Sequence, residues 1–281
     1  MLEQELLATL FSLAAAIAWG SGDFSGGLAV KRHNAYSVLL TSQAISLLPL
    51  IALILWFEPF LPSQQDVLLG MLTGIFVMLA LMHFYIGLAK GRMSVVAPVA
   101  AIIACVIPVM LGMWTQGLPS PLQLGGFALA LLAVWLLSNP DSKLKASAME
   151  LRYALISGLC FAGVFICLHS VSGETRLWPV FTARATSMVT VGIYTFTRGY
   201  WVMPSRPLLP LIALAGLFDV LGSYCFVMAS HAGRLDMVTL FASLYPAVTV
   251  LLAWLIIKEQ LEKKQWAGVL TSFIAIGLLV W

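Results

Sequence analysis

The sequence contains few charged residues. Only 10% of its 281 residues are Asp, Glu, Lys or Arg, whereas 61% are hydrophobic and the mean hydropathy is +0.98. A water-soluble domain carries roughly a quarter charged residues, so this chain could not cover a folded surface with polar groups in water. The scarcity predicts an integral membrane protein and excludes a soluble enzyme or a nucleic-acid partner.

Three further features are missing. The four cysteines (Cys105, Cys160, Cys167 and Cys225) all fall in apolar runs and show neither a disulfide framework nor metal-ligand spacing, so no metal or cofactor is expected. The N-terminus carries Glu3 and Glu5 rather than basic residues, so we expect no signal peptide. No ~10-residue segments alternate between polar and apolar residues as membrane barrel strands do.

Long apolar runs are what the chain does contain. Lipid offers no hydrogen bonds to the backbone, so runs of about 20 apolar residues predict membrane helices. We expect an all-α integral membrane fold of ten spans, at about 6–29, 36–57, 67–88, 94–115, 121–138, 152–172, 178–198, 207–229, 236–257 and 265–281. The one longer polar stretch, 139–151, is expected to be a cytoplasmic linker between a first unit (1–138) and a second (152–281).

The basic residues are distributed unevenly over the predicted loops. The loops after the odd-numbered spans hold twelve of them: Lys31, Arg32, Lys90, Arg92, Lys143, Lys145, Arg152, Arg198, Arg206, Lys258, Lys263 and Lys264. The other side holds Arg176 and Arg234. Cytoplasmic loops are enriched in Lys and Arg, so we expect a plasma membrane protein, bacterial inner membrane by type, with both termini outside the cytoplasm.

An imperfect internal repeat supports the division of the chain into two units. Gly91, Val96, Ala100, Gln123 and Gly126 each recur 142 residues later, at Gly233, Val238, Ala242, Gln265 and Gly268. A five-helix unit ends on the side opposite its start, so its second copy is inverted. Inverted repeats with a site at the midplane are typical of secondary transporters.

Charged side chains inside the spans are the first candidates for a site. Asp219 lies near the middle of the eighth span, Asp23 follows Trp19 by one helical turn in the first, and Arg184 lies in the seventh. Intramembrane charges are costly, and they mark substrate or proton pathways unless they serve helix packing. Asp219 is interpreted as a proton-coupling acid, a contact for a substrate amine, or a structural carboxyl group.

Other candidates come from histidine, proline and aromatic residues. His83 could relay protons, although a lone buried histidine is more often only hydrogen-bonded. Pro98 and the Tyr245-Pro246 pair could break helices near a cavity. Tyr85, Tyr224 and Tyr245 could stack on a substrate, or could instead anchor the chain at the membrane interface.

The final run, from Gly233 to Trp281, resembles the end of an EamA-type domain of the drug/metabolite transporter superfamily. The residues that carry the resemblance are Gly233, Ser243, Leu244, Tyr245, Pro246, Thr249, Glu259, Gln265 and Gly268, together with AWGSGDF at 18–24 and GRMSVVAP at 91–98. The resemblance implies two EamA units in a basket-like fold with a central cavity. It also implies that Arg184 matches an arginine of the second helix of a unit, where the first unit has Gln43, and it adds Ser243 to the site candidates.

These patterns predict a secondary transporter. It would export or import a small metabolite, such as an amino acid or a drug-like solute, by alternating access, as a monomer or homodimer, with proton coupling left open. Two alternatives remain: a polytopic membrane enzyme, for which no nucleophile, base or metal cluster is evident, and a non-transporting membrane scaffold. The substrate and the direction of transport do not follow from the sequence.

Overall fold

A computed structural model describes residues 2–58, 60–90, 93–137, 147–172, 175–258 and 263–280. Within these ranges all regular structure is helical, which confirms the predicted all-α class. The helices are α1 (Leu2–Val30), α2 (Ala35–Phe57), α3 (Gln64–Lys90), α4 (Met93–Gln116), α5 (Pro121–Leu137), α6 (Ala148–His169), α7 (Leu177–Thr197), a 3₁₀ turn η1 (Arg206–Leu208), α8 (Leu209–Ala232), α9 (Leu235–Ala242), α10 (Tyr245–Ile257) and α11 (Lys263–Val280).

Local sequence signals explain where two helices start or stop differently from the prediction. The sixth begins at Ala148 rather than 152, because Ser147 and Glu150 form a reciprocal capping box. The end of the predicted linker therefore belongs to α6, and residues 139–146 lie outside the described residues. The ninth span is divided: α9 ends at Ala242 and α10 begins at Tyr245, with Pro246 in its first turn, where the missing N–H costs nothing.

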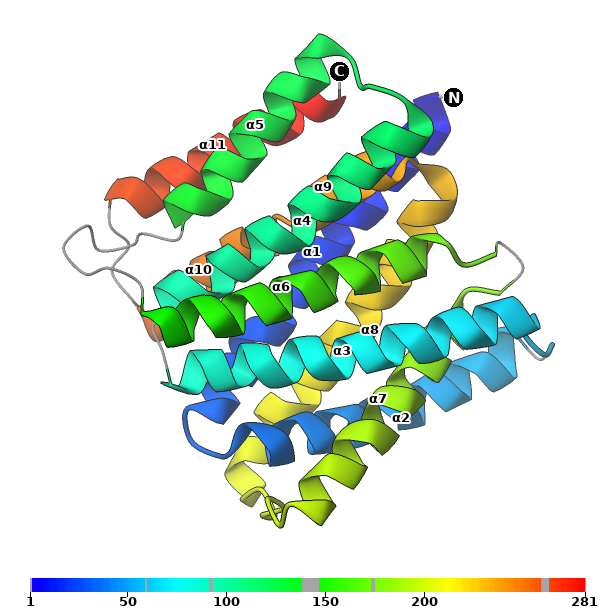
Figure 1. The fold of residues 1–281 in the computed structure, drawn as a ribbon, viewed down its shortest axis with the longest axis vertical. Coiled ribbons are helices and arrows are strands. Elements are labelled where there is room, and N and C mark those ends of the chain that lie inside the picture. The colour runs from blue at the N-terminus through cyan, green and yellow to red at the C-terminus, as the bar shows by residue number, and fades with distance from the viewer. Residues whose placement is uncertain are drawn as a thin grey trace.

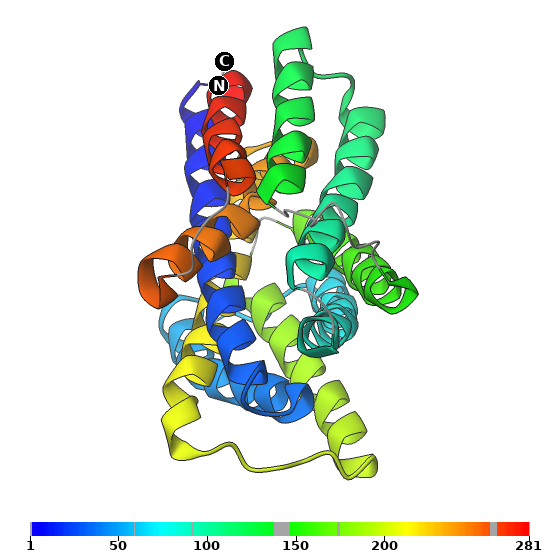
Figure 2. The ribbon, with the colours of Figure 1, turned by 90° about the vertical axis from the view of Figure 1, so that its left-hand side faces the viewer.

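The helices form two facing layers (Figures 1 and 2). One, the front layer, contains α3, α4 and α6; the other, the back layer, contains α1, α8, α9 and α10 (Figure 1). The pairs α2–α7 and α5–α11 lie at the two ends of the layers (Figure 1). Each layer therefore combines helices from both halves of the chain.

Helix contacts occur in pairs that are related to each other by swapping the two halves of the chain. The closest-packed pairs include α1–α8 and its counterpart α6–α3, and α4–α6 and its counterpart α9/α10–α1. Two glycines 142 residues apart serve the same purpose in this scheme. Gly74 on α3 lies against the backbone carbonyl of Ala183 on α7, and Gly216 on α8 lies against that of Ser42 on α2, so a Cβ on either glycine would collide with backbone. The two halves thus pack as related units.

Hydrogen bonds between the turns show which helix ends lie together. At one end, His33 and Asn34 after α1 contact the carbonyls of Val202 and Tyr200 after α7. At the other end, Glu58 after α2 accepts hydrogen bonds from the backbone N–H groups of Arg176 and Leu177. The start of α2 therefore lies beside the end of α7 and the end of α2 beside the start of α7, so these two helices are antiparallel.

The turn after α8 is also tied to the turn after α4. Arg234 donates to the carbonyls of Gln116 and Gly117 at 3.0 and 2.6 Å and to Asp236, whose hydrogen bond raises the pKa of Arg234. The Gly-Arg turn at 233–234 therefore closes the C-terminal end of α4 from the other half of the chain. Its earlier copy, Gly91-Arg92, lies outside the described residues.

The exterior suits a lipid environment. Large apolar side chains are exposed along the helices, among them Leu55, Trp114, Ile193 and Leu270. Within the described residues, seven helical stretches are long and apolar enough to span a membrane: Gln4–Val30, Ala35–Phe57, Gln64–Lys90, Val99–Gln116, Ala148–His169, Arg206–Ala232 and Leu235–Ile257. Pro121–Ala133 is a shorter apolar helix. The chain is therefore a multi-pass membrane protein.

Candidate functional site

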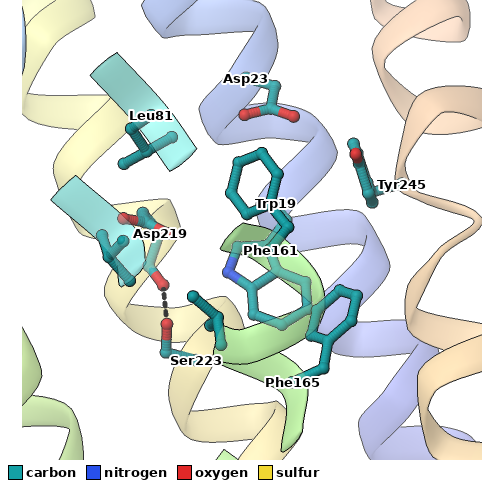
Figure 3. A pocket seen from close by; sticks show the side chains of 10 residues that line it. Trp19, Asp23, Leu81, Phe161, Phe165, Asp219, Ser223 and Tyr245 are labelled. Carbon is teal, nitrogen blue, oxygen red and sulfur yellow. Dashed lines mark hydrogen bonds between the residues drawn. The ribbon is translucent and has the colours of Figure 1, made fainter. Parts of the chain in front are cut away.

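A small cavity lies between the front and back layers, and Figure 3 shows the side chains that line it. The back layer contributes Trp19 and Asp23 from α1, Asp219 and Ser223 from α8, and Tyr245 from α10. The front layer contributes Val77 and Leu81 from α3, and Phe161, Val164 and Phe165 from α6.

The α1 wall of the cavity is built on glycines. Gly20 lies against the carbonyl of Tyr245 on α10, and Gly222 on α8 lies against the indole ring of Trp19, so larger residues at either position would force the helices apart. This close packing brings Asp23 and Asp219 into electrostatic range of each other. Asp23 has neither a hydrogen bond nor an ion pair to any side chain in the described ranges, and its carboxylate faces the cavity (Figure 3).

A buried polar centre, formed by Arg184, Gln43 and Asp219, lies on the side of Asp219 that is away from the cavity. Arg184 Nη1 donates to Asp219 Oδ2 at 2.5 Å and to Gln43 Oε1 at 2.6 Å. The Arg184 side chain is only 4% exposed, whereas that of Asp219 is 24% exposed and lines the cavity. The centre therefore joins α7, α8 and α2, and of its members Asp219 lines the cavity while Arg184 and Gln43 do not.

Two nitrogen atoms of this polar centre carry N–H groups that have no acceptor among the described residues. Arg184 Nε and Gln43 Nε2 are buried and have no partner within the part of the chain that the structure describes. Buried donors without partners are costly, so this position between α2 and α7 is suited to an internal water molecule or to a rearrangement of the arginine fork. Neither atom is accessible from the cavity in this conformation.

Aromatic rings close one end of the cavity. Trp19 lies against Phe165 and Phe226, with centroids at 5.4 and 5.6 Å, and Phe165 stacks on Phe226 at 5.1 Å. Along α1, α6 and α8 these three residues lie toward the end that carries the turn between α8 and α9, and Asp23 lies away from it. The rings therefore separate the carboxylates from that side of the molecule.

The structure brings together four of the residues that the sequence predicted for the site: Trp19, Asp23, Asp219 and Tyr245 all line the cavity. Arg184 lies directly behind them. The break between α9 and α10 accounts for Tyr245, because it makes this residue the first of α10, where α10 meets α1.

The remaining predicted residues lie elsewhere. His83 Nδ1 is within 2.8 Å of the Leu79 carbonyl and its ring faces Tyr153. Tyr85 is buried with its hydroxyl against Gly26, in electrostatic range of Asp23 and Asp219 but outside the cavity lining.

Tyr224 packs against the apolar core of the layers. Ser243 donates to the Thr239 carbonyl at 2.7 Å, which uses its hydroxyl hydrogen within the helix break. Pro98 lies within the unbroken helix α4. Among the described residues no group of three His, Cys, Asp or Glu side chains is placed to hold a metal ion.

The cavity also contains residues that sequence reasoning did not select, chiefly Phe161, Val77 and Leu81. A signal for them existed. Phe161 follows Trp19 by 142 residues, and Val77 and Leu81 precede Asp219 and Ser223 by the same interval. The repeat, applied to the candidate residues themselves, would have identified the opposite wall.

Comparison with known families agrees with this architecture. The sequence model of the EamA-like transporter family matches residues 6–139 and again residues 149–281. The chain belongs to the EamA-like transporter family. The resemblance inferred from its motifs is thereby confirmed, and each half of the chain is one family unit.

Comparison with solved structures concerns the fold. A protein whose description is simply "Crystal structure of protein" superposes with a TM-score of 0.77, over 97% of each chain, at 13% sequence identity. At that identity the match shows a shared fold alone. A search of curated proteins found no match.

Proposed function

We propose that this EamA-family protein is a secondary transporter that carries a small solute through the cavity between its two layers. The observation that carries the proposal is a cavity that opens onto two carboxylates at the junction of two related halves, in a molecule with an apolar exterior. Intramembrane carboxylates that line a cavity are typical of substrate and ion pathways.

The membrane arrangement is part of the proposal. We propose ten crossings in two inverted five-helix repeats, with α9 and α10 together forming one crossing and both termini outside the cytoplasm of a plasma membrane. The antiparallel pairing of α2 with α7 and the exchange of contacts between the halves support this arrangement. Rocking of the front layer against the back layer would then open the cavity to each side in turn.

A cavity-filling variant tests transport without disturbing the buried ion pair. Phe161→Trp adds atoms to the cavity, whereas Phe196→Trp adds the same atoms to a side chain that is 61% exposed on the outer surface. Small solutes are compared in the medium of cells that express the wild type, each variant, or no protein.

We expect at least one solute to change in amount with the wild type and with Phe196→Trp, and to return to the background level with Phe161→Trp. Equal solute profiles for the wild type and for cells without the protein, or full activity of Phe161→Trp, would contradict the proposal.

A further inference from the structure

The two walls of the cavity are equivalent in position but opposite in chemistry. Four pairs of lining residues are separated by 142 positions: Trp19 and Phe161, Asp23 and Phe165, Val77 and Asp219, and Leu81 and Ser223. In the last three pairs a polar residue on the back layer faces an apolar residue on the front layer. The repeat thus generated a symmetric cavity whose side chains have since diverged.

The polar residues of the two halves gather on the same wall of the cavity. Because α1 of the first half packs on α8 of the second, Asp23, Asp219 and Ser223 come together on one wall. Because α3 packs on α6, Val77, Leu81 and the phenylalanines form the other. The cavity therefore has an acidic wall opposite an apolar and aromatic one.

The charge of the acidic wall is not balanced by the residues around it. Arg184 pairs with Asp219, while no cationic group among the described residues pairs with Asp23. Arg184 Nε and Gln43 Nε2 behind the wall are buried, and neither Arg184 nor Gln43 is among the residues that line the cavity. With both carboxylates ionised, the site carries one negative charge in excess, and none of the described residues that line the cavity is cationic.

Aromatic rings adjoin the same space. Trp19 and Tyr245 lie beside Asp23, and Phe161 and Phe165 lie across from it (Figure 3). Aromatic faces attract cations and also accept apolar groups. The surfaces therefore suit a ligand that is cationic at one end and apolar at the other.

We propose that the cavity binds amphipathic organic monocations. The cationic group lies between Asp23 and Asp219, and the apolar group packs against Phe161, Phe165, Val77 and Leu81. This assignment rests on the proposed function, since it takes the cavity to be the transport site. It favours a cation over the amino acid considered from the sequence, because Arg184 is paired with Asp219 and does not line the cavity, so the described lining holds no cationic partner for a carboxylate.

Four small probes that share a phenyl group test the assignment with the purified full-length protein. They are 2-phenylethylammonium, the neutral 2-phenylethanol, the anionic 3-phenylpropionate and zwitterionic phenylalanine, and binding is measured by equilibrium dialysis in detergent micelles, with protein-free micelles as the blank. We expect the ammonium to bind at least about tenfold more tightly than the other three, a difference of ~1.4 kcal/mol.

Matched variants connect the preference to the acidic wall. Asp23→Asn should remove the preference for the ammonium, Asp23→Glu should retain most of it, and Glu5→Gln, which neutralises an exposed acid near the N-terminus, should leave it unchanged. Phe161→Ala should weaken 2-phenylethylammonium more than ethylammonium. Thermal unfolding of each variant shows that it remains folded.

Three results would overturn the assignment: equal or tighter binding of the zwitterion or anion, no binding of the ammonium, or an unchanged preference in a folded Asp23→Asn variant. Each would leave the proposed function standing if Phe161→Trp still abolished the solute change in the medium. Conversely, selective binding of the ammonium without any solute change would support the site and contradict transport.

Discussion

Two arginine–aspartate pairs in this protein have the same chemistry and different surroundings. Arg184 and Asp219 are 2.5 Å apart, and the carboxylate is the more exposed partner at 24%. Arg234 and Asp236 are 2.8 Å apart, and there the carboxylate is fully buried while the arginine is 38% exposed. In the first pair the carboxylate faces the cavity, and in the second pair the carboxylate is enclosed by the protein.

Both pairs also connect the two halves of the chain, but at different depths. Arg184 on α7 reaches the buried Gln43 on α2, whereas Arg234 reaches the carbonyls of Gln116 and Gly117 at the end of α4. An acid that faces a cavity can exchange its partner for a substrate or a proton, and a sealed acid cannot. The comparison therefore predicts that changes at the first pair affect transport as well as stability, whereas changes at the second pair affect stability alone.

The largest effect is expected for Arg184→Leu. The change leaves Asp219 in the membrane interior without its cation, and breaking a buried pair costs ~3–5 kcal/mol. Thermal unfolding followed by size-exclusion chromatography should show a large loss of folded protein. The double variant with Asp219→Leu should recover most of the stability but none of the transport; a double variant that transports like the wild type would remove the pair from the mechanism.

Asp219→Asn is expected to act on transport more than on folding. The amide keeps the shape and an acceptor for Arg184 but cannot exchange a proton. In inverted vesicles, uptake of the solute identified in the medium should lose its response to a proton gradient, while solute exchange continues. Proton-driven uptake at the wild-type rate would show that Asp219 does not couple protons.

Arg234→Ala is expected to lower stability by about 1–2 kcal/mol, because the buried acceptors of Asp236 lose a donor. Solute affinity should stay unchanged, because Arg234 is not among the residues that line the cavity. Thermal unfolding and ligand binding on the same sample separate the two quantities. A weaker affinity at unchanged stability would reverse the contrast between the pairs.

The smallest effect is expected for Gln43→Leu. Arg184 loses one acceptor, but the change also removes the buried Nε2 group, which has no partner among the described residues. The two contributions oppose each other, so we expect a stability change below about 1 kcal/mol in the same unfolding assay. A loss as large as that of Arg184→Leu would show that Gln43, rather than Asp219, holds the arginine.

Much of the fold was accessible from the sequence because lipid imposes strong local rules. Apolar runs predicted the helices, since a backbone in lipid must form its own hydrogen bonds. The Tyr245-Pro246 pair predicted the interruption that separates α9 from α10. The charges at Asp23 and Asp219 pointed to two helices that line the cavity, because such charges are rare and costly in membranes.

The arrangement of the site was less accessible. Lipid tails are as apolar as a protein core, so periodicity along a membrane helix does not show which face turns inward. Trp19 and Tyr245 were therefore indistinguishable in sequence from His83, Tyr85 and Tyr224, which the cavity leaves out. Phe161 and Leu81 look like ordinary apolar residues until the structure places them opposite the carboxylates.

The sequence by itself determined that this is a helical membrane protein of two related halves with costly charges in its interior. Those properties depend on composition and on neighbours within one helix. Only the tertiary structure decided that Arg184 pairs with Asp219, that Asp23 has no side-chain partner in the described part of the chain, and that the polar residues of both halves gather on one wall. Those choices depend on which glycine faces let α1 pack on α8 and α3 on α6, and such contacts join residues far apart in the chain.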